Sequence, residues 1–156
     1  TLSSSSAASD VYKRQVSNFT IDNLKELESK YGVLPAINQV EFHPYHYQKE
    51  LLEYCNSKNI IIEAYSPLVH AKRMDEPRLV AISDELSKTP AQVLIRWAMQ
   101  RGMVVLPKSV NQNRIIENFA VFDFEISDSI MKRLDDLDER FVTCWDPHNP
   151  PPYAPV

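Results

Sequence analysis

Glycine is almost absent from this chain of 156 residues, which contains only Gly32 and Gly102. A phosphate loop of the G-x-G-x-x-G type needs several glycines close together, because a side chain there would keep the backbone away from the pyrophosphate. The chain therefore has no Rossmann motif. If it binds a dinucleotide, the ligand must be held in some other way.

Other absences narrow the class of protein. The two cysteines, Cys55 and Cys144, fit no metal-binding spacing, and we expect them to be reduced thiols in a cytoplasmic protein. No apolar run approaches the roughly 18 residues of a membrane span, and no secretory leader is recognisable. The net charge of −4 argues against general binding to nucleic acid or membrane surfaces, which needs a basic face.

The composition that remains is ordinary for one globular domain, with 44% hydrophobic and 24% charged residues. The N-terminal stretch "TLSSSSAASDVYKRQ" differs, because it is rich in serine and alanine and has no apolar period. We interpret residues 1–15 as translated adaptor sequence, with a native disordered tail as the alternative. The folded part is then expected at residues 16–142, beginning inside an element, and a C-terminal tail at residues 143–156.

The folded part alternates between the apolar periods of strands and of helices. Strands are expected at residues 36–42, 60–66 and 103–107. Helices are expected at residues 21–31, 47–59, 76–88, 89–102, 113–119 and 127–138. Short apolar strands that alternate with helices are typical of repeated βα units, so the pattern predicts an α/β fold with a parallel sheet.

Local signals refine these expectations. Thr20 and Gly32 are placed to cap the first helix, and Thr89 begins a capping box with Pro90 in the first turn. The first helix is expected to bury the face that carries Ile21, Leu24, Leu27 and Tyr31. The run "IIIEAYS" is continuously apolar at its start, which is typical of a strand buried on both faces.

Polar or aromatic residues follow the apolar runs at four places, in the stretches "SNF", "QVEFHP", "YSPL" and "KSVNQNR". Sites on parallel sheets lie at the carboxyl ends of the strands, so these stretches predict a pocket built from side chains. In the last of them, Lys108, Ser109 and Arg114 stand where a helix begins, which suits an anion. A solvated helix face is the alternative.

Several motifs follow one another along residues 16–142: "VSNF", "NQVEFHPY", "EAYSPL", "TPAQVLIRW" and "PKSVNQNRIIEN". In this order and at these separations they resemble the C-terminal half of an aldo-keto reductase. The resemblance implies the last four βα units of a TIM-type (β/α)8 barrel. It also implies that the complete protein uses NADPH (NADP+) to reduce a small carbonyl substrate, an aldehyde or ketone, to an alcohol.

The resemblance implies which residues hold the nicotinamide end of the cofactor. Ser17, Asn18 and Gln39 match positions that hydrogen-bond the carboxamide, and Tyr65 matches the aromatic residue that stacks on the nicotinamide ring. Capping by Ser17 or Asn18 and core packing of Tyr65 are the structural alternatives. The family usually has glycine where Gln15 stands, which puts the local geometry around Ser17 in question.

The remaining matches concern the rest of the cofactor and the substrate. Ser66 and Leu68 match positions along the pyrophosphate path. The 2′-phosphate and adenosine end would be held by Lys108, Ser109, Arg114, Glu117 and Asn118. By the same resemblance the C-terminal tail folds over the barrel mouth, with Trp145 as its contact to the substrate pocket; a disordered tail is the alternative.

No catalytic residue and no metal ligand can be assigned. His43 stands at a strand end, but the family's catalytic residues come from the first four βα units, which the resemblance does not cover. We therefore expect His43 to be structural and this polypeptide to be inactive alone. The alternative to an enzyme is a non-catalytic NADPH-binding module or sensor subunit built on the same barrel.

Overall fold

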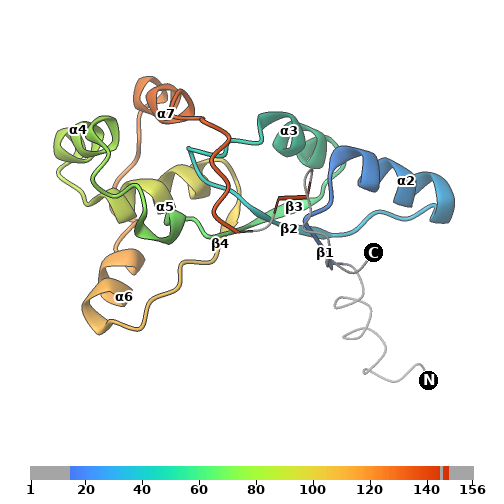
Figure 1. Ribbon diagram of the computed structural model, residues 1–156, viewed down its shortest axis with the longest axis horizontal. Helices are drawn as coiled ribbons and strands as arrows, with labels where there is room; N and C mark the ends of the chain where they lie inside the picture. The colour runs from blue at the N-terminus through green and yellow to red at the C-terminus, as the bar shows by residue number, and fades with distance from the viewer. Residues whose placement is uncertain (1–14, 145, 148–156) are drawn as a thin grey trace. The chain divides into compact units, whose positions relative to one another are not determined.

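The computed structural model describes residues 15–144 and 146–147 (Figure 1). The strands are β1 (Gln15–Ser17), β2 (Ile37–Glu41), β3 (Ile61–Tyr65) and β4 (Val104–Val105). The helices are α2 (Ile21–Tyr31), α3 (Lys49–Ser57), the 3-10 turn η1 (Val69–Ala71), α4 (Pro77–Leu86), α5 (Pro90–Gln100), α6 (Gln112–Phe119) and α7 (Asp128–Asp135). The expected N-terminal stretch, apart from Gln15, and most of the expected tail lie outside these residues.

The four strands form one sheet in the order β1-β2-β3-β4, which is the order of the sequence. β1 and β2 are parallel, with Gln15 opposite Ile37 and Ser17 opposite Gln39. Further along the sheet, the backbone of Leu106 donates to the carbonyl of Ala64 at 3.0 Å. The predicted α/β fold with a parallel sheet is confirmed.

The helix boundaries follow the capping signals of the sequence. Thr20 and Asn23 form a capping box at the start of α2, and Gly32 ends this helix in the left-handed conformation at φ +66°. Thr89 and Gln92 form the same box at the start of α5. These local signals suffice because each one supplies a partner for a backbone group that the helix itself leaves unpaired.

The described residues form two compact units, and β2 and β3 contribute residues to both. The first unit contains residues 15–40, 48–63 and 146–147. In this unit α2 and α3 lie on the same side of the strands (Figure 1) and are joined by an ion pair of 2.8 Å between Lys58 and Glu28. Its core contains Leu24 and Cys55 together with the polar Asn38, and all three are 0% exposed.

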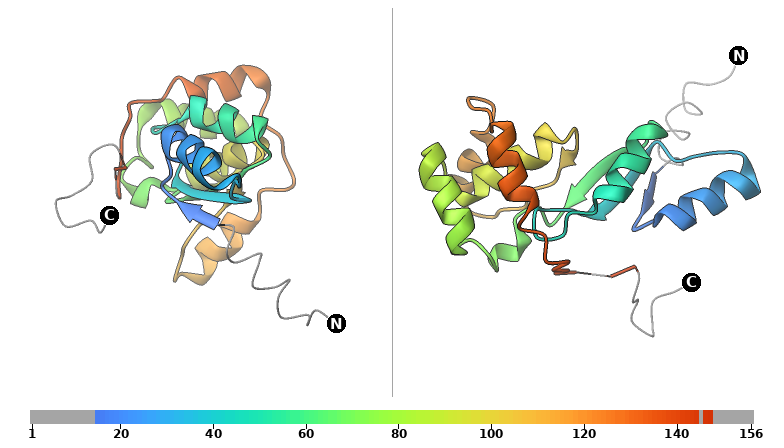
Figure 2. Two further views of the ribbon diagram at one scale, coloured as in Figure 1. Left: turned by 90° about the vertical axis from the view of Figure 1, so that its right-hand side faces the viewer. Right: turned by 90° about the horizontal axis from the view of Figure 1, so that it is seen from above.

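The second unit contains residues 41–47 and 64–144. Its central helix is α5, which contacts α4, α6 and β4, and α4 packs beside it in both Figure 1 and the right-hand view of Figure 2. Trp97 of α5 is fully buried, packs against the rings of Phe42 and Tyr47, and donates its indole N–H to Asp135 at 2.9 Å. This unit positions the ends of β3 and β4.

Two burial predictions are wrong. Tyr31 is 70% exposed, because it is the last residue of α2 and the chain turns away at Gly32. Ile61 is 48% exposed whereas Ile62 is 2% exposed. Successive side chains point to opposite faces of a sheet, so β3 buries the face of Ile62 and leaves the face of Ile61 largely open among the described residues.

None of the helices in the described part of the chain has the length and apolar character that crossing a membrane requires.

Candidate functional site

At the end of β1 and in the middle of β2, the structure brings Ser17, Asn18 and Gln39 together. The Ser17 hydroxyl donates to the backbone carbonyl of Gln39 at 3.1 Å, and the Asn18 backbone N–H donates to the same oxygen at 2.9 Å. Asn18 has a left-handed backbone conformation, with φ at 57°, which ends β1 immediately after Ser17. The three residues predicted as one group are therefore neighbours.

Glu63 is a member of this group that sequence reasoning missed. Its Oε2 atom accepts hydrogen bonds from the side-chain amides of Gln39 and Gln15, the latter at 3.2 Å. The carboxylate thereby orients the side-chain amide of Gln39, with its nitrogen toward Glu63. A lone glutamate inside an apolar run is the only sequence signal for this role.

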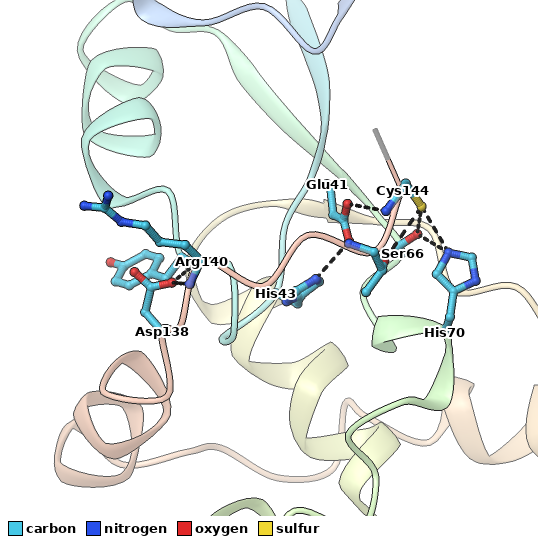
Figure 3. Close-up of polar contacts among 9 residues, drawn as sticks. Glu41, His43, Ser66, His70, Asp138, Arg140 and Cys144 are labelled. Atoms are coloured by element: carbon cyan, nitrogen blue, oxygen red, sulfur yellow. Dashed lines mark hydrogen bonds and ion pairs between the residues drawn. The ribbon is translucent and has the colours of Figure 1, made fainter. Parts of the chain in front are cut away.

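The end of β3 carries Tyr65, Ser66 and Leu68, in the second unit. Ser66 has φ at 50°, and its hydroxyl lies 3.1 Å from Nε2 of His70 and 3.1 Å from Sγ of Cys144 (Figure 3). Leu68 immediately precedes η1, and its carbonyl accepts the N–H of Ala71 at 2.8 Å. Sequence reasoning missed that this turn holds the C-terminal segment.

The buried carboxylate of Glu41 anchors the same segment (Figure 3). It is 2% exposed and accepts hydrogen bonds from the Thr143 N–H at 2.8 Å, the Thr143 hydroxyl and the Cys144 N–H at 3.0 Å. Burial alone would raise the pKa of Glu41, but the hydrogen bonds from His43, Thr143 and Cys144 outweigh it and lower that pKa to about 2. Glu41 is therefore a carboxylate at any ordinary pH.

His43 and Tyr45 lie too deep to meet a substrate. His43 is 1% exposed, with Nε2 at 3.1 Å from Glu41. Tyr45 is 0% exposed, and burial together with the charge of Glu76 raises its pKa, which is the opposite of what a proton donor needs. Neither side chain is presented for acid–base chemistry.

The start of α6 is organised around Asn111. This residue is the N-cap, and its side chain accepts the backbone N–H of Arg114 at 3.2 Å. Ser109 holds the turn before it, since its hydroxyl accepts the backbone N–H of Asn111 at 3.1 Å. The segment from residue 107 to residue 111 thus connects the region after β4 to the N-terminus of α6. The unpaired N–H groups and the dipole of this N-terminus favour an anion.

Two exposed cations, Lys108 and Arg114, stand at the start of this helix. Neither makes an ion pair with a described residue. Beside them lies an open hollow of about 400 Å³, lined by Pro107, Ser109, Ile115, Ile116, Asn118 and Phe119. A cationic rim next to a largely apolar hollow suits a ligand that joins a phosphate to a flat ring.

Glu117 and Asn118, the other residues predicted for the adenosine end of the cofactor, lie on α6, which contacts α5. Glu117 accepts the hydroxyl proton of Thr89 at 2.6 Å, and Gln92 donates to the Ala120 carbonyl at 2.9 Å. Asn118 is 9% exposed. Trp145, predicted for the substrate pocket, lies outside the described residues. Within the part of the chain that the structure describes, no three His, Cys, Asp or Glu side chains gather as metal ligands.

Comparison with known proteins adds to this geometry. The model of the aldo/keto reductase family matches residues 10–139. An uncharacterized oxidoreductase of Schizosaccharomyces pombe is 44% identical over 133 residues, which cover 85% of this chain and 48% of that protein. The glyoxal reductase of Bacillus subtilis is 46% identical over 127 residues, which cover 80% of this chain and 46% of that protein.

Among solved structures, a mutant of Gox0644 in complex with NADPH is similar with a TM-score of 0.80 and 37% identity. The similarity covers 85% of this chain and 49% of that one. The chain thus spans about half the length of the curated relatives that it matches.

Proposed function

The chain belongs to the aldo/keto reductase family, and we propose that the complete protein reduces aldehydes or ketones to alcohols with NADPH. In this proposal the four parallel strands are half of a TIM-type (β/α)8 barrel, and this chain supplies cofactor-binding residues. The sequential strand order and the match to about half of each relative support the half-barrel. The name of the Bacillus subtilis relative supports an aldehyde as the substrate class.

The observation that carries the proposal is the pair of exposed cations at the start of α6. Lys108 and Arg114 have no ion pair with a described residue and stand beside the hollow that Asn118 lines. A 2′-phosphate on a ribose would provide the missing counter-charge, and the guanidinium of Arg114 can meet two phosphate oxygens at once. Adenine would then occupy the hollow, near Glu117 and Asn118. This arrangement favours NADPH over NADH, which has no 2′-phosphate.

The nicotinamide end is assigned to the end of β1, the middle of β2 and the end of β3. Ser17, Asn18 and Gln39 offer donors and acceptors of the kinds that a carboxamide needs. Tyr65 would stack on the ring and leave the opposite ring face open. Ser66 and Leu68, at the turn after β3, are assigned to the pyrophosphate.

The chemistry of the bound cofactor is delivery of a hydride to a carbonyl carbon. The residues of this chain hold and orient that cofactor, which contributes to catalysis by positioning. They do not supply the proton for the carbonyl oxygen, because His43 and Tyr45 are buried and the pKa of Tyr45 is raised. We therefore expect the polypeptide alone to oxidise no NADPH when an aromatic aldehyde is added. The relatives with printed activities are oxidoreductases, which supports an enzyme over a sensor subunit.

The assignment of the adenosine end can be tested with two ligands of equal charge. Adenosine 2′,5′-bisphosphate and adenosine 3′,5′-bisphosphate differ only in where one phosphate is attached. Titrated into the chain in a calorimeter, the 2′ isomer should bind about tenfold or more tightly, the scale of one charged hydrogen bond. Equal affinities would mean that Lys108 and Arg114 do not read a 2′-phosphate, and the preference for NADPH would lose its basis.

A further inference from the structure

A negative charge lies beside the residues assigned to the nicotinamide end of the cofactor, on Glu63. The Oε2 atom of Glu63 accepts hydrogen bonds from the side-chain amides of Gln39 and Gln15. Both partners are N–H donors, so Glu63 acts as an acceptor, which is the role of an ionised carboxylate. Gln39 stands opposite Ser17 in the pair of β1 and β2, and all four residues belong to the first unit. The charge is therefore one side chain away from the group assigned to the carboxamide.

The lysines of the first unit do not compensate this charge. The described residues of the unit contain four lysines, and each has a different partner. Lys30 pairs with Glu26, Lys49 pairs with Glu53, Lys58 pairs with Glu28, and Lys25 lies over the ring of Tyr54. No ion pair between described residues involves Glu63. A cationic group that binds beside Gln39 would therefore meet a carboxylate whose charge the lysines of this unit leave in place.

Glu63 lies on the open face of β3. Its neighbours in the strand, Ile62 and Ala64, are 2% and 0% exposed and occupy the buried face. Because successive side chains of a strand alternate between faces, Glu63 shares the face of Ile61, which is 48% exposed. The hydrogen bond to Gln39 places both side chains on this face. A ligand that meets Gln39 thus approaches the carboxylate without crossing the core.

The two oxidation states of the cofactor differ in charge at the nicotinamide ring. The dihydronicotinamide ring of NADPH is neutral, and transfer of its hydride to a carbonyl carbon leaves the cationic ring of NADP+. The phosphates are the same in both states. A carboxylate near the ring therefore stabilises the oxidised state over the reduced one. It also makes bound NADPH a stronger hydride donor, because the positive charge that develops during the transfer is stabilised.

We propose that Glu63 is a positioning residue that sets the preference of this site for the oxidised over the reduced cofactor. It orients the amide of Gln39 and places a negative charge beside the ring that becomes cationic. This inference rests on the proposed function, because it requires the nicotinamide to bind at Ser17 and Gln39. Glu63 acts through Gln39 and through its electric field, and it supplies no proton to the substrate.

The ratio of two affinities measures this preference. NADP+ and NADPH are titrated in a calorimeter into the wild type and into Glu63→Gln, which keeps an acceptor oxygen for Gln39 but removes the charge. The affinity for NADP+ relative to NADPH should fall about fivefold, the upper end of what a partly exposed charge pair is worth. Glu63→Asp retains the charge and should retain most of the wild-type ratio. Glu53→Gln, at a side chain that is 66% exposed on α3, is the control and should not change the ratio.

A second variant neutralises the carboxylate from outside. Gln15 is exposed on β1, and its amide already lies 3.2 Å from Glu63, so a lysine there can pair with the carboxylate. Gln15→Lys leaves Glu63 and Gln39 in place and should lower the ratio in the same direction as Glu63→Gln. An unchanged ratio in Gln15→Lys overturns the proposal. Equal losses of NADP+ and NADPH affinity in Glu63→Gln would mean that Glu63 only supports Gln39, and this result also overturns the role of the charge.

Adenosine 2′,5′-bisphosphate locates the effect, because it lacks the nicotinamide ring. Its affinity should be the same in the wild type, Glu63→Gln and Gln15→Lys. A change as large as that of NADP+ would mean that the charge acts on the phosphates, which overturns the proposal. If both cofactors bind to the wild type and neither variant changes their ratio, the proposal fails and the proposed function stands. If neither cofactor binds to the wild type, the proposed function fails and this inference fails with it.

Discussion

At the scale of single residues, Glu41 makes the clearest electrostatic contribution to stability. Its folded-state pKa of about 2 lies below the ordinary value of 4.5. A carboxyl group whose pKa is lowered by folding stabilises the folded state fully above its ordinary pKa, and this stabilisation is lost as the pH falls through the folded value. The contribution of Glu41 should therefore be present above pH 4.5 and disappear between pH 4.5 and about pH 2.

Glu41→Gln tests this contribution. At pH 7 the variant should lose about 2–3 kcal/mol of unfolding free energy, because the amide cannot accept all the hydrogen bonds that the carboxylate accepts. Its urea midpoint should also depend less on pH than that of the wild type between pH 4.5 and about pH 2. Glu53→Gln, at a side chain that is 66% exposed, serves as the control and should change little. Parallel pH profiles for Glu41→Gln and wild type would refute the assignment.

Individual site residues could be predicted to different extents. Ser17, Asn18 and Gln39 were predicted as a group from the family resemblance, and they are neighbours because Ser17 stands opposite Gln39 in the parallel pair of β1 and β2. The anchor formed by Glu41 was not predicted, since Thr143 lies 102 positions away in the sequence and no local pattern encodes that contact. The same reason hides the pairing of His70 with Cys144, which are 74 positions apart.

At the scale of elements, the left-handed end of α4 gives a sharp prediction. Ser87 ends this helix with φ at 51°, a conformation that costs a residue with a side chain about 1–2 kcal/mol more than it costs glycine. Glycine in turn loses more backbone entropy on folding, by about 0.5–1 kcal/mol. Ser87→Gly should therefore stabilise the chain by about 0.5–1 kcal/mol in urea unfolding.

The matched control lies in the same helix. Ala81 is exposed in the interior of α4, so Ala81→Gly should destabilise the chain by about 1 kcal/mol. Opposite signs for the two glycine substitutions are the expected result. If both variants lose stability by the same amount, the backbone at Ser87 is not left-handed in solution.

Helices and strands were easier to predict than the surfaces that they bury. The capping boxes at Thr20 and Thr89 are short-range patterns and gave the helix starts correctly. The exposure of Ile61 could not be read from its apolar neighbours, because burial of a strand face depends on what covers it. A run such as "IIIEAYS" therefore predicts a strand without saying whether both of its faces are covered.

At the scale of the whole molecule, the proposed half-barrel has a consequence for association. The strand order places β1 and β4 at the two ends of the sheet, and β4 carries Val104 with 46% of its surface exposed. An uncovered edge strand with apolar side chains pairs readily with another chain. We expect the polypeptide to associate as its concentration rises, as seen by size-exclusion chromatography with light scattering.

A charge on the edge strand should oppose this association. Val104→Lys places a lysine on β4, a device by which natural edge strands avoid pairing, and should shift the chain toward the monomer. Val33→Lys is the control, because Val33 is also exposed, at 57%, but lies in the loop after α2 rather than in a strand. A wild-type chain that is monomeric at every concentration, with a sharp cooperative melt, would contradict the account of its open edges.

The central claim is that this chain binds NADPH through the cations at the start of α6, and one calorimetric comparison tests it most directly. NADPH and NADH are titrated into the wild type, into Arg114→Ala and into Lys132→Ala, which removes an exposed cation from α7. Arg114→Ala should weaken NADPH binding by about 1.5–3 kcal/mol, the scale of a charged hydrogen bond, and leave NADH binding nearly unchanged. Lys132→Ala should affect neither. Equal losses of NADPH and NADH affinity in Arg114→Ala would contradict the claim.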